Sequence, residues 1–243
     1  YKFLISINMK RIIFVFVLAF SLTNAFSQGF SGGLFGGLNT SWISTDSKLV
    51  EPTGIKIGYT FGATADFGLT DNFGVTTAIQ FANVGGAFKF IHGVYELTAS
   101  EVEIPKKLNA NTQLDLNINY INIPIGLKGK TNEIGYVTYF LKGGVTPMFR
   151  SKALADINVT DGIEDPNDLL VNDHIKMINF GWHLGGGIEY SLAGNTRLLL
   201  ELVYTGGLMD FTKVNAFIDE LQVDQSNPAT RLNDVHLKVG ILF

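Results

Sequence analysis

The sequence has 243 residues, 46% of them hydrophobic, with a formal net charge of −4, 27 glycines and no cysteine. The lack of cysteine excludes disulfides, cysteine-based metal sites and a lipid-anchored N-terminal cysteine, and the slightly acidic charge argues against a nucleic-acid partner. Outside the N-terminal region no run of about 18 apolar residues occurs, which excludes a bundle of membrane-spanning helices.

The N-terminal region has the pattern of an export signal. Two basic residues follow Met9, an apolar run covers 12–20, and small residues precede position 28. This order of charge, apolar run and cleavage site is typical of signal peptides, and the run is too short for a membrane anchor. We therefore predict an upstream extension over residues 1–8, a signal peptide over 9–27 and one β-barrel domain over 28–243.

The rest of the sequence alternates between apolar and polar residues in eight segments. Strict alternation is the signature of a strand with one apolar and one polar face. It is clear at the C-terminal end, where Val235, Leu237 and Val239 share one parity while His236 and Lys238 share the other. The eight predicted strands cover 29–43, 54–69, 73–91, 114–130, 136–152, 175–192, 196–211 and 234–243.

Within the fourth predicted strand the apolar pattern changes phase. Apolar residues occupy even positions from Leu114 to Tyr120 and odd positions from Ile121 to Leu127. A change of phase moves the apolar side chains to the other face unless the strand contains an extra residue. The sequence therefore predicts a β-bulge near Tyr120.

Short and long connections alternate along the chain. The short ones, at 71–72, 131–135 and 194–195, are rich in turn-forming residues. The long ones cover 44–53, 92–113, 153–174 and 212–230. Outer-membrane barrels have short periplasmic turns and longer outer loops. The sequence therefore predicts an all-β fold, an eight-stranded antiparallel up-and-down transmembrane β-barrel in the cell outer membrane, with both termini in the periplasm.

A soluble barrel with its apolar face inside would show the same period. The export signal, the final apolar Phe243 and the charges at mid-strand on the polar face favour the membrane barrel instead. Aromatic residues also gather near both predicted membrane interfaces, as they do in outer-membrane barrels. They are Phe30, Phe67, Phe73, Tyr139, Tyr190 and Phe243 at the periplasmic side, and Trp42, Tyr59, Phe81, Trp182 and Tyr204 at the outer side.

The charged residues on the polar face are expected to fill the lumen. A barrel of eight strands is only wide enough for its own side chains, and isolated buried charges are costly. We therefore expect an ion network in the periplasmic half of the lumen, with a proton or small-ion path as the alternative. Its predicted members are Lys128, Lys142, Glu189, Glu201 and Lys238.

The stretch Tyr120–Lys130, YINIPIGLKGK, resembles the Y-x-x-I-P-x-x-x-K stretch of PorT-like outer-membrane β-barrel proteins. Further similarities are the glycine-rich first strand, the glycines at 143–144 and 185–187, and the C-terminal phenylalanine. The resemblance implies an outer-membrane barrel, and the namesake of the family is associated with type IX secretion and gliding. Resemblance to other outer-membrane barrels also implies that Phe243 is the C-terminal signal for the barrel assembly machinery.

We expect a structural or partner-binding role with a closed lumen. The expected contacts are outer-membrane lipid and lipopolysaccharide, the barrel assembly machinery during biogenesis, and a protein partner at the outer loops or the periplasmic rim. A type IX secretion subunit, a lipid-modifying enzyme and a narrow channel are the alternatives.

We expect no enzyme activity, no cofactor and no metal site. A lipid-modifying barrel would need a serine, a histidine and an acid near the outer leaflet. The four histidines are His92, His174, His183 and His236, and none accompanies a recognisable nucleophile. The acidic stretch over 156–162 is similar to a calcium loop, but its glycine comes one place late. A solvated loop is expected there, with divalent-ion bridging to lipopolysaccharide as the alternative.

Overall fold

The computed structural model describes residues 29–46, 50–91, 95–97, 106–108, 111–158, 168–212 and 229–243. The predicted upstream extension and signal peptide lie outside these residues. The long strands are β1 Phe30–Thr45, β2 Val50–Gly68, β3 Phe73–Phe90, β6 Gln113–Asn122, β7 Ile125–Lys130, β8 Val137–Asn158, β10 Ile178–Ala193, β11 Thr196–Gly207 and β12 Thr230–Leu242. The short elements are β4 Tyr95–Leu97, β5 Lys106–Leu108, β9 Leu169–Leu170 and the 3-10 helix η1 Asn172–His174. None of the described helices is long and apolar enough to cross a membrane.

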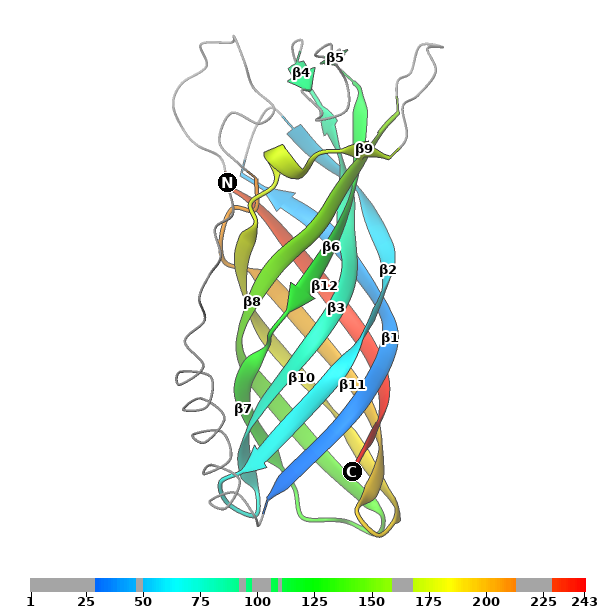
Figure 1. The fold of residues 1–243 in the computed structure, drawn as a ribbon, viewed down its shortest axis with the longest axis vertical. Helices are drawn as coiled ribbons and strands as arrows, with labels where there is room; N and C mark the ends of the chain where they lie inside the picture. The colour runs from blue at the N-terminus through cyan, green and yellow to red at the C-terminus, as the bar shows by residue number, and fades with distance from the viewer. Residues whose placement is uncertain are drawn as a thin grey trace, which may run out of the picture.

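The long strands form a closed antiparallel ring (Figure 1). The ring closes where β12 pairs with β1, from Gly33 opposite Leu242 to Thr45 opposite Thr230. β6 and β7 share one position, because both pair with β3 and with β8. They are separated at Pro124, which has no N–H to donate to a ladder. Counted this way, the described strands occupy eight positions, which is consistent with the predicted number.

The two ends of the barrel differ. Short turns connect β2 to β3, β7 to β8 and β10 to β11 at the lower end of Figure 1, where β12 also ends. Gly135 and Gly194 lie in two of these turns at φ values of 68° and 58°, which glycine adopts without steric cost. The predicted link 153–174 is partly wrong, because β8 continues to Asn158 and β9 pairs with it. The predicted link 92–113 likewise contains β4 and β5.

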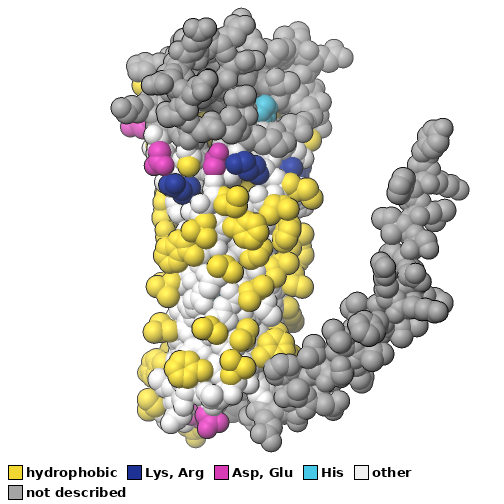
Figure 2. All heavy atoms as spheres, turned by 90° about the vertical axis from the view of Figure 1, so that its left-hand side faces the viewer, with side chains coloured by type: hydrophobic (Ala, Val, Ile, Leu, Met, Phe, Trp, Pro, Cys, Tyr) yellow, Lys and Arg dark blue, Asp and Glu magenta, His cyan; other side chains and the backbone are white. Residues whose placement is uncertain are grey.

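The exterior of the barrel carries a wide apolar band with charged side chains on the loop side (Figure 2). Leu34, Leu127 and Leu141 in this band are 63%, 66% and 69% exposed, while inward polar side chains such as Thr60 are buried. The apolar face therefore lies outside, as in a membrane barrel and opposite to a soluble barrel. Aromatic contacts such as Trp182 with Tyr204, at 5.2 Å between ring centroids, lie toward the loop-side edge of the band.

The loop-side part of the barrel has the opposite arrangement. On its exterior, the Asn83 amide donates to the side-chain oxygens of Asn117 and Asn119 at 2.6 Å each. Its interior is an apolar core, as in a water-soluble protein. The fully buried members of this core, at 0–2% exposure, are Ile43, Val84, Leu114, Leu116, Ile118, Tyr120, Met148, Ala153, Ala155, Ile157, Val171, Ile175, Phe211 and Leu232.

This arrangement corrects the predicted change of phase in the fourth strand. Every second residue of β6 from Leu114 to Asn122 is buried, so the strand keeps one face inside throughout. What changes is the chemistry of the interior, which is apolar near the loops and polar farther down. A register shift does lie between Asn119 and Tyr120, but the extra residue is Ser151 of the partner strand β8.

Val239→Arg tests the orientation of the apolar face. Val239 is 56% exposed in the middle of the band, so an arginine there would be held in hydrocarbon. We expect a loss of about 2–4 kcal/mol in the free energy of unfolding, measured by urea titration in lipid vesicles. Thr53→Arg, at an exposed position near the loop-side end of β2, is the control and should change little. Equal effects of the two substitutions would contradict the orientation.

Candidate functional site

Glycines on the inward faces make room for the large side chains of the lumen. A Cβ on Gly187 of β10 would overlap the Leu200 carbonyl and lie 2.8 Å from the Phe140 ring. A Cβ on Gly126 of β7 would overlap the Gly143 carbonyl and lie 3.0 Å from Nε2 of His183. The glycine-rich alternation of the sequence therefore reflects a lumen that is filled by neighbouring side chains.

A cluster of four charged residues, Asp66, Lys128, Glu189 and Arg197, lies at the turn end of the lumen; we call it the turn-side cluster. Lys128 Nζ donates to Asp66 Oδ2 and to Glu189 Oε1, at 2.5 Å each. Arg197 pairs with the second oxygen of Glu189 and donates to Ser31 Oγ at 2.8 Å. Two cations thus face two carboxylates, and Glu189 is 1% exposed. Such pairing satisfies charges that would be costly if left alone.

Phe243 lies beside this cluster and completes the ring. Its N–H donates to the Gly32 carbonyl at 2.7 Å, and the Gly32 N–H donates back to the Phe243 carbonyl at 3.2 Å. Ser31 Oγ donates to the same Phe243 carbonyl at 3.1 Å. The aromatic ring is 60% exposed on the apolar face. The structure thus gives Phe243 a place in the closure, while its role as an assembly signal stays a prediction.

A second group, Lys142, Glu201, Lys238 and Gln80, lies deeper in the lumen; we call it the middle cluster. Lys142 forms an ion pair with Glu201, and their side chains are 11% and 4% exposed. Glu201 lies directly across the β11–β12 ladder from Lys238. Lys238 Nζ donates to Gln80 Oε1 at 2.8 Å and lies 4.8 Å from the centre of the Phe35 ring. Glu201 therefore lies between two cations.

The structure divides the predicted ion network between these two clusters. Lys128 and Glu189 belong to the turn-side cluster, and Lys142, Glu201 and Lys238 belong to the middle cluster. The predicted network did not include Asp66, Arg197 and Gln80. Inward parity places Asp66 and Arg197 on the polar face, but it does not show that they pair with Lys128 and Glu189. Gln80 carries no charge, so no sequence signal separates it from the other polar residues of β3.

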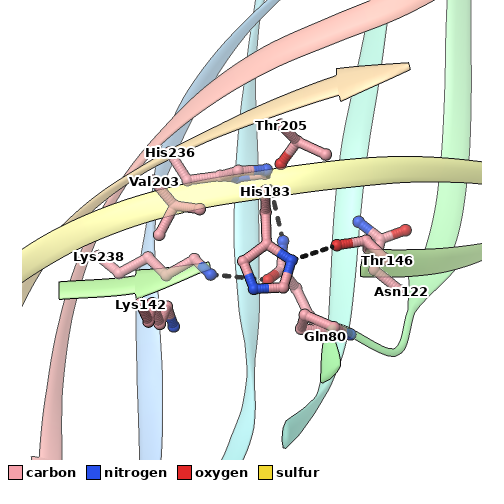
Figure 3. A pocket seen from close by; sticks show the side chains of 10 residues that line it. Gln80, Asn122, Lys142, Thr146, His183, Val203, Thr205, His236 and Lys238 are labelled. Carbon is pink, nitrogen blue, oxygen red and sulfur yellow. Dashed lines mark hydrogen bonds between the residues drawn. The ribbon is translucent and has the colours of Figure 1, made fainter. Parts of the chain in front are cut away.

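A small polar cavity lies next to the middle cluster (Figure 3). His183 is hydrogen-bonded through Nδ1 to Thr146 Oγ1 at 2.9 Å, and His236 Nε2 lies 2.6 Å from Asp234 Oδ1. The free space is about 10 Å³, roughly enough for one water molecule. The cavity is lined by Gln80, Asn122, Pro124, Lys142, Thr146, His183, Val203, Thr205, His236 and Lys238.

The remaining histidines lie apart from this cavity. His174 is 9% exposed in η1, and His92 lies outside the described residues. Within the described ranges no three histidine or acidic side chains are grouped so that they could hold a metal ion. Of the acidic stretch that is similar to a calcium loop, Asp156 lies on β8, and the part from 159 onward lies outside the described residues.

The middle cluster predicts unequal costs for the removal of its charges. Glu201→Leu leaves two buried lysines without a carboxylate, so it should cost more than Lys142→Met, and each should cost about 3–5 kcal/mol of unfolding free energy. The double variant should cost less than the sum of the two, which urea titration in vesicles would show. Arg231→Met, which breaks an ion pair whose side chains are 42% and 66% exposed, should cost less than about 1 kcal/mol. Additive costs for Lys142 and Glu201 would contradict the pairing.

The chain is similar to known proteins in two of three comparisons. Similar solved structures include OprG of Pseudomonas aeruginosa, with 14% identity, a TM-score of 0.46, and coverage of 88% of this chain and 96% of that one. Ail of Yersinia pestis has 12% identity, a TM-score of 0.39, and coverage of 89% of this chain and 100% of that one. Neisserial surface protein A has 11% identity, a TM-score of 0.40, and coverage of 87% and 97%. A search of curated proteins finds no match. The family described as outer membrane protein beta-barrel domain matches residues 18–213. The chain therefore belongs to this family of β-barrels, and it resides in the outer membrane.

Proposed function

We propose that this protein is a closed outer-membrane scaffold that binds a partner through its rim rather than a pore that conducts solutes. The observation that carries the proposal is the filled lumen. The turn-side cluster, the middle cluster and the apolar core follow one another along the described strands, and Glu189, Lys238 and Ile118 at these three levels are all at most 3% exposed. A barrel of this size has no width left for a passage once such side chains fill it.

The loop-side end supports the same proposal. β9 and η1 lie at this end of the barrel, where β9 pairs with β8 (Figure 1). Ile175 forms an isolated bridge with Thr212, and Val171, Ile175 and Phe211 are each 0% exposed. The chain therefore adds apolar side chains to the core at the loop side. A water-filled channel would need polar residues there instead.

The lengths of the strands support a role for the loop-side rim. A tilted strand needs about 9–11 residues to cross a membrane, whereas β2 has 19 and β8 has 22. The excess builds a wall beyond the apolar band with a polar exterior, including Asn83, Asn117 and Asn119. Such a wall exposes a rigid surface to the outside of the cell. We therefore propose the outer rim as the partner-binding surface.

We also propose that the protein is related to PorT-like barrels, with a type IX secretion subunit as the alternative function. The support is the stretch Tyr120–Lys130. In the structure this stretch spans the interruption between β6 and β7, with Tyr120 and Lys128 buried inside. The motif therefore serves the packing of the lumen, so it supports a shared fold more than a shared task.

A non-enzymatic role is part of the proposal. His183 and His236 are 3% and 1% exposed inside the barrel, away from the face that contacts lipid. A lipid-modifying site would need its base on the outer face, beside a nucleophile. Lipid analysis of a deletion strain should therefore show an unchanged lipid A. A modified lipid that is lost in the deletion strain and restored by the intact gene would favour the enzyme.

Planar-bilayer recording tests the closed lumen. The inserted protein should give no conductance steps, because each described level of the lumen is filled. Vesicle insertion should first be shown by protection of the barrel from protease. Conductance steps whose size changes in Lys142→Met would contradict the proposal, since that substitution acts only inside the barrel.

Site-specific photo-cross-linking in native membranes tests the partner-binding rim. A photoreactive residue at Thr53, exposed near the loop-side end of β2, should yield a protein adduct. The same residue at Leu237, 50% exposed in the apolar band, is the control and should yield lipid adducts. The lack of a protein adduct at Thr53, with full-length protein present, would contradict the outer rim as the binding surface.

A further inference from the structure

The lumen contains one cation that differs from the others. Arg150 occupies the last inward position of β8 before the extra residue Ser151. Its Nε and Nη1 atoms are buried and make no hydrogen bond. Lys128 and Lys142, by contrast, each pair with a carboxylate. Lys238 has no carboxylate in an ion pair either, but it donates to Gln80, whereas Arg150 has neither a described carboxylate in an ion pair nor a hydrogen bond from Nε and Nη1.

Two further hydrogen-bond donors face the same place. Tyr120 lies directly across the β6–β8 ladder from Arg150, and Asn179 lies across the β8–β10 ladder from Met148. Tyr120 and Asn179 are 1% and 0% exposed. The Arg150 guanidinium and the Asn179 amide both lie close enough to the Tyr120 hydroxyl to interact with it. Tyr120 Oη and Asn179 Nδ2 are nevertheless buried without a partner in good hydrogen-bond geometry. Side chains from three neighbouring strands thus bring hydrogen-bond donors without acceptors close together.

The acceptors near this point are neutral amide oxygens, which supply no negative charge, and one of them, Asn122 Oδ1 at the next inward position of β6, is buried without a partner. The side-chain oxygen of Asn179 accepts the N–H of Phe180 at 2.8 Å, which leaves its NH₂ group for another partner. A guanidinium has donors only, and a neutral phenol readily donates a hydrogen bond to an anion. The three side chains therefore form a group of donors with one positive charge and no negative charge.

The surroundings make this group costly unless something binds it. Leu116 and Ile118 of the apolar core lie on β6 toward the loops, and the polar cavity with Asn122 and Thr146 lies toward the turns. A buried donor without an acceptor destabilises the fold, and a partly buried charge such as that of Arg150 does so as well when it has no counter-charge. A water molecule would supply acceptors but no charge. An anion would supply both.

We propose that Arg150, Tyr120 and Asn179 form a binding site for a small inorganic anion, a halide or a small oxyanion. The bound anion neutralises the guanidinium and joins β6, β8 and β10 at the bulge, where the polar lumen meets the apolar core. The site acts on the stability of the barrel and is independent of the partner-binding rim. It lies at the bulge, because beyond Ser151 the inward positions of β8 change parity and belong to Ala153, Ala155 and Ile157 of the apolar core.

Bromide is the probe for a direct test. Crystals of the full chain grown in sodium bromide should show an anomalous peak within hydrogen-bonding distance of Arg150, Tyr120 and Asn179. Crystals grown in nitrate should show a planar ion at the same place if the site accepts oxyanions. If the site is restricted to halides, only the crystals grown in bromide should show a bound ion there. Density for a water molecule without an anomalous peak in saturating bromide would overturn the proposal.

Thermal unfolding in detergent gives a second readout. The unfolding midpoint of the wild type should rise with bromide concentration relative to sodium gluconate at the same ionic strength. Arg150→Met keeps the size of the side chain and removes the charge, so the bromide-dependent rise should be lost. Lys152→Met, on the exposed side of the same bulge, is the matched control and should keep the full rise.

A milder variant covers the case in which Arg150→Met does not fold. Tyr120→Phe keeps the ring in the apolar core and removes only the hydroxyl, so it should fold and show a rise at least twofold smaller than that of the wild type. A rise of equal size in wild type, Tyr120→Phe and Lys152→Met would show a general salt effect and overturn the site. An unfolding midpoint of the wild type that is the same in both salts would also overturn it.

Discussion

The constraint on which this structure depends is that every backbone N–H and C=O group in membrane hydrocarbon must find a partner within the protein. The pairing of β12 with β1 meets this constraint for the two strands that would otherwise be edges. Phe243 takes part through its reciprocal hydrogen bonds with Gly32. Closure also forces the inward faces of all the strands into one narrow lumen. Charges distant in sequence must therefore pair across it, as Lys128 does with Glu189.

One set of strands, with the same alternation of inward and outward residues, passes through two surroundings, lipid and water. Where the barrel faces lipid, the apolar side chains point outward and the polar ones pair inside. Beyond the apolar band the exterior meets water, so the preference reverses and Leu114, Leu116 and Ile118 form a core. The strands continue through this boundary without changing which residues face inward. The boundary is therefore marked by the chemistry of the lumen, from the middle cluster to the apolar core.

Alternation in the sequence was enough to predict the ring, the inward face of β12 and the inward position of all five residues of the predicted network. It could not predict which charges pair, because pairing depends on the stagger of strands around the barrel, which no single strand encodes. Hence Lys128 and Lys142 appeared as members of one network, and Asp66 and Arg197 were not assigned to it. The bulge near Tyr120 was placed on the wrong strand because apolar residues were assumed to face lipid everywhere. Arg150 shares the inward parity of Lys142, but the sequence does not show that it has no carboxylate partner, because that depends on which strands lie beside β8.

The balance of charge inside the barrel explains why a filled lumen also argues against ion conduction. In the turn-side cluster Lys128 and Arg197 balance Asp66 and Glu189. In the middle cluster Lys142 and Lys238 face Glu201, and Asp234 lies two inward positions from Lys238 on β12, beyond His236. A pore that selects ions needs a ring of like charges or dipoles that replaces the hydration shell of the ion. The opposite charges of each pair attract each other instead, and they link strands that carry glycines on their inward faces. Arg150 differs from these residues because its buried Nε and Nη1 make neither an ion pair nor a hydrogen bond, so an anion at the base of the apolar core would supply both its counter-charge and its acceptors.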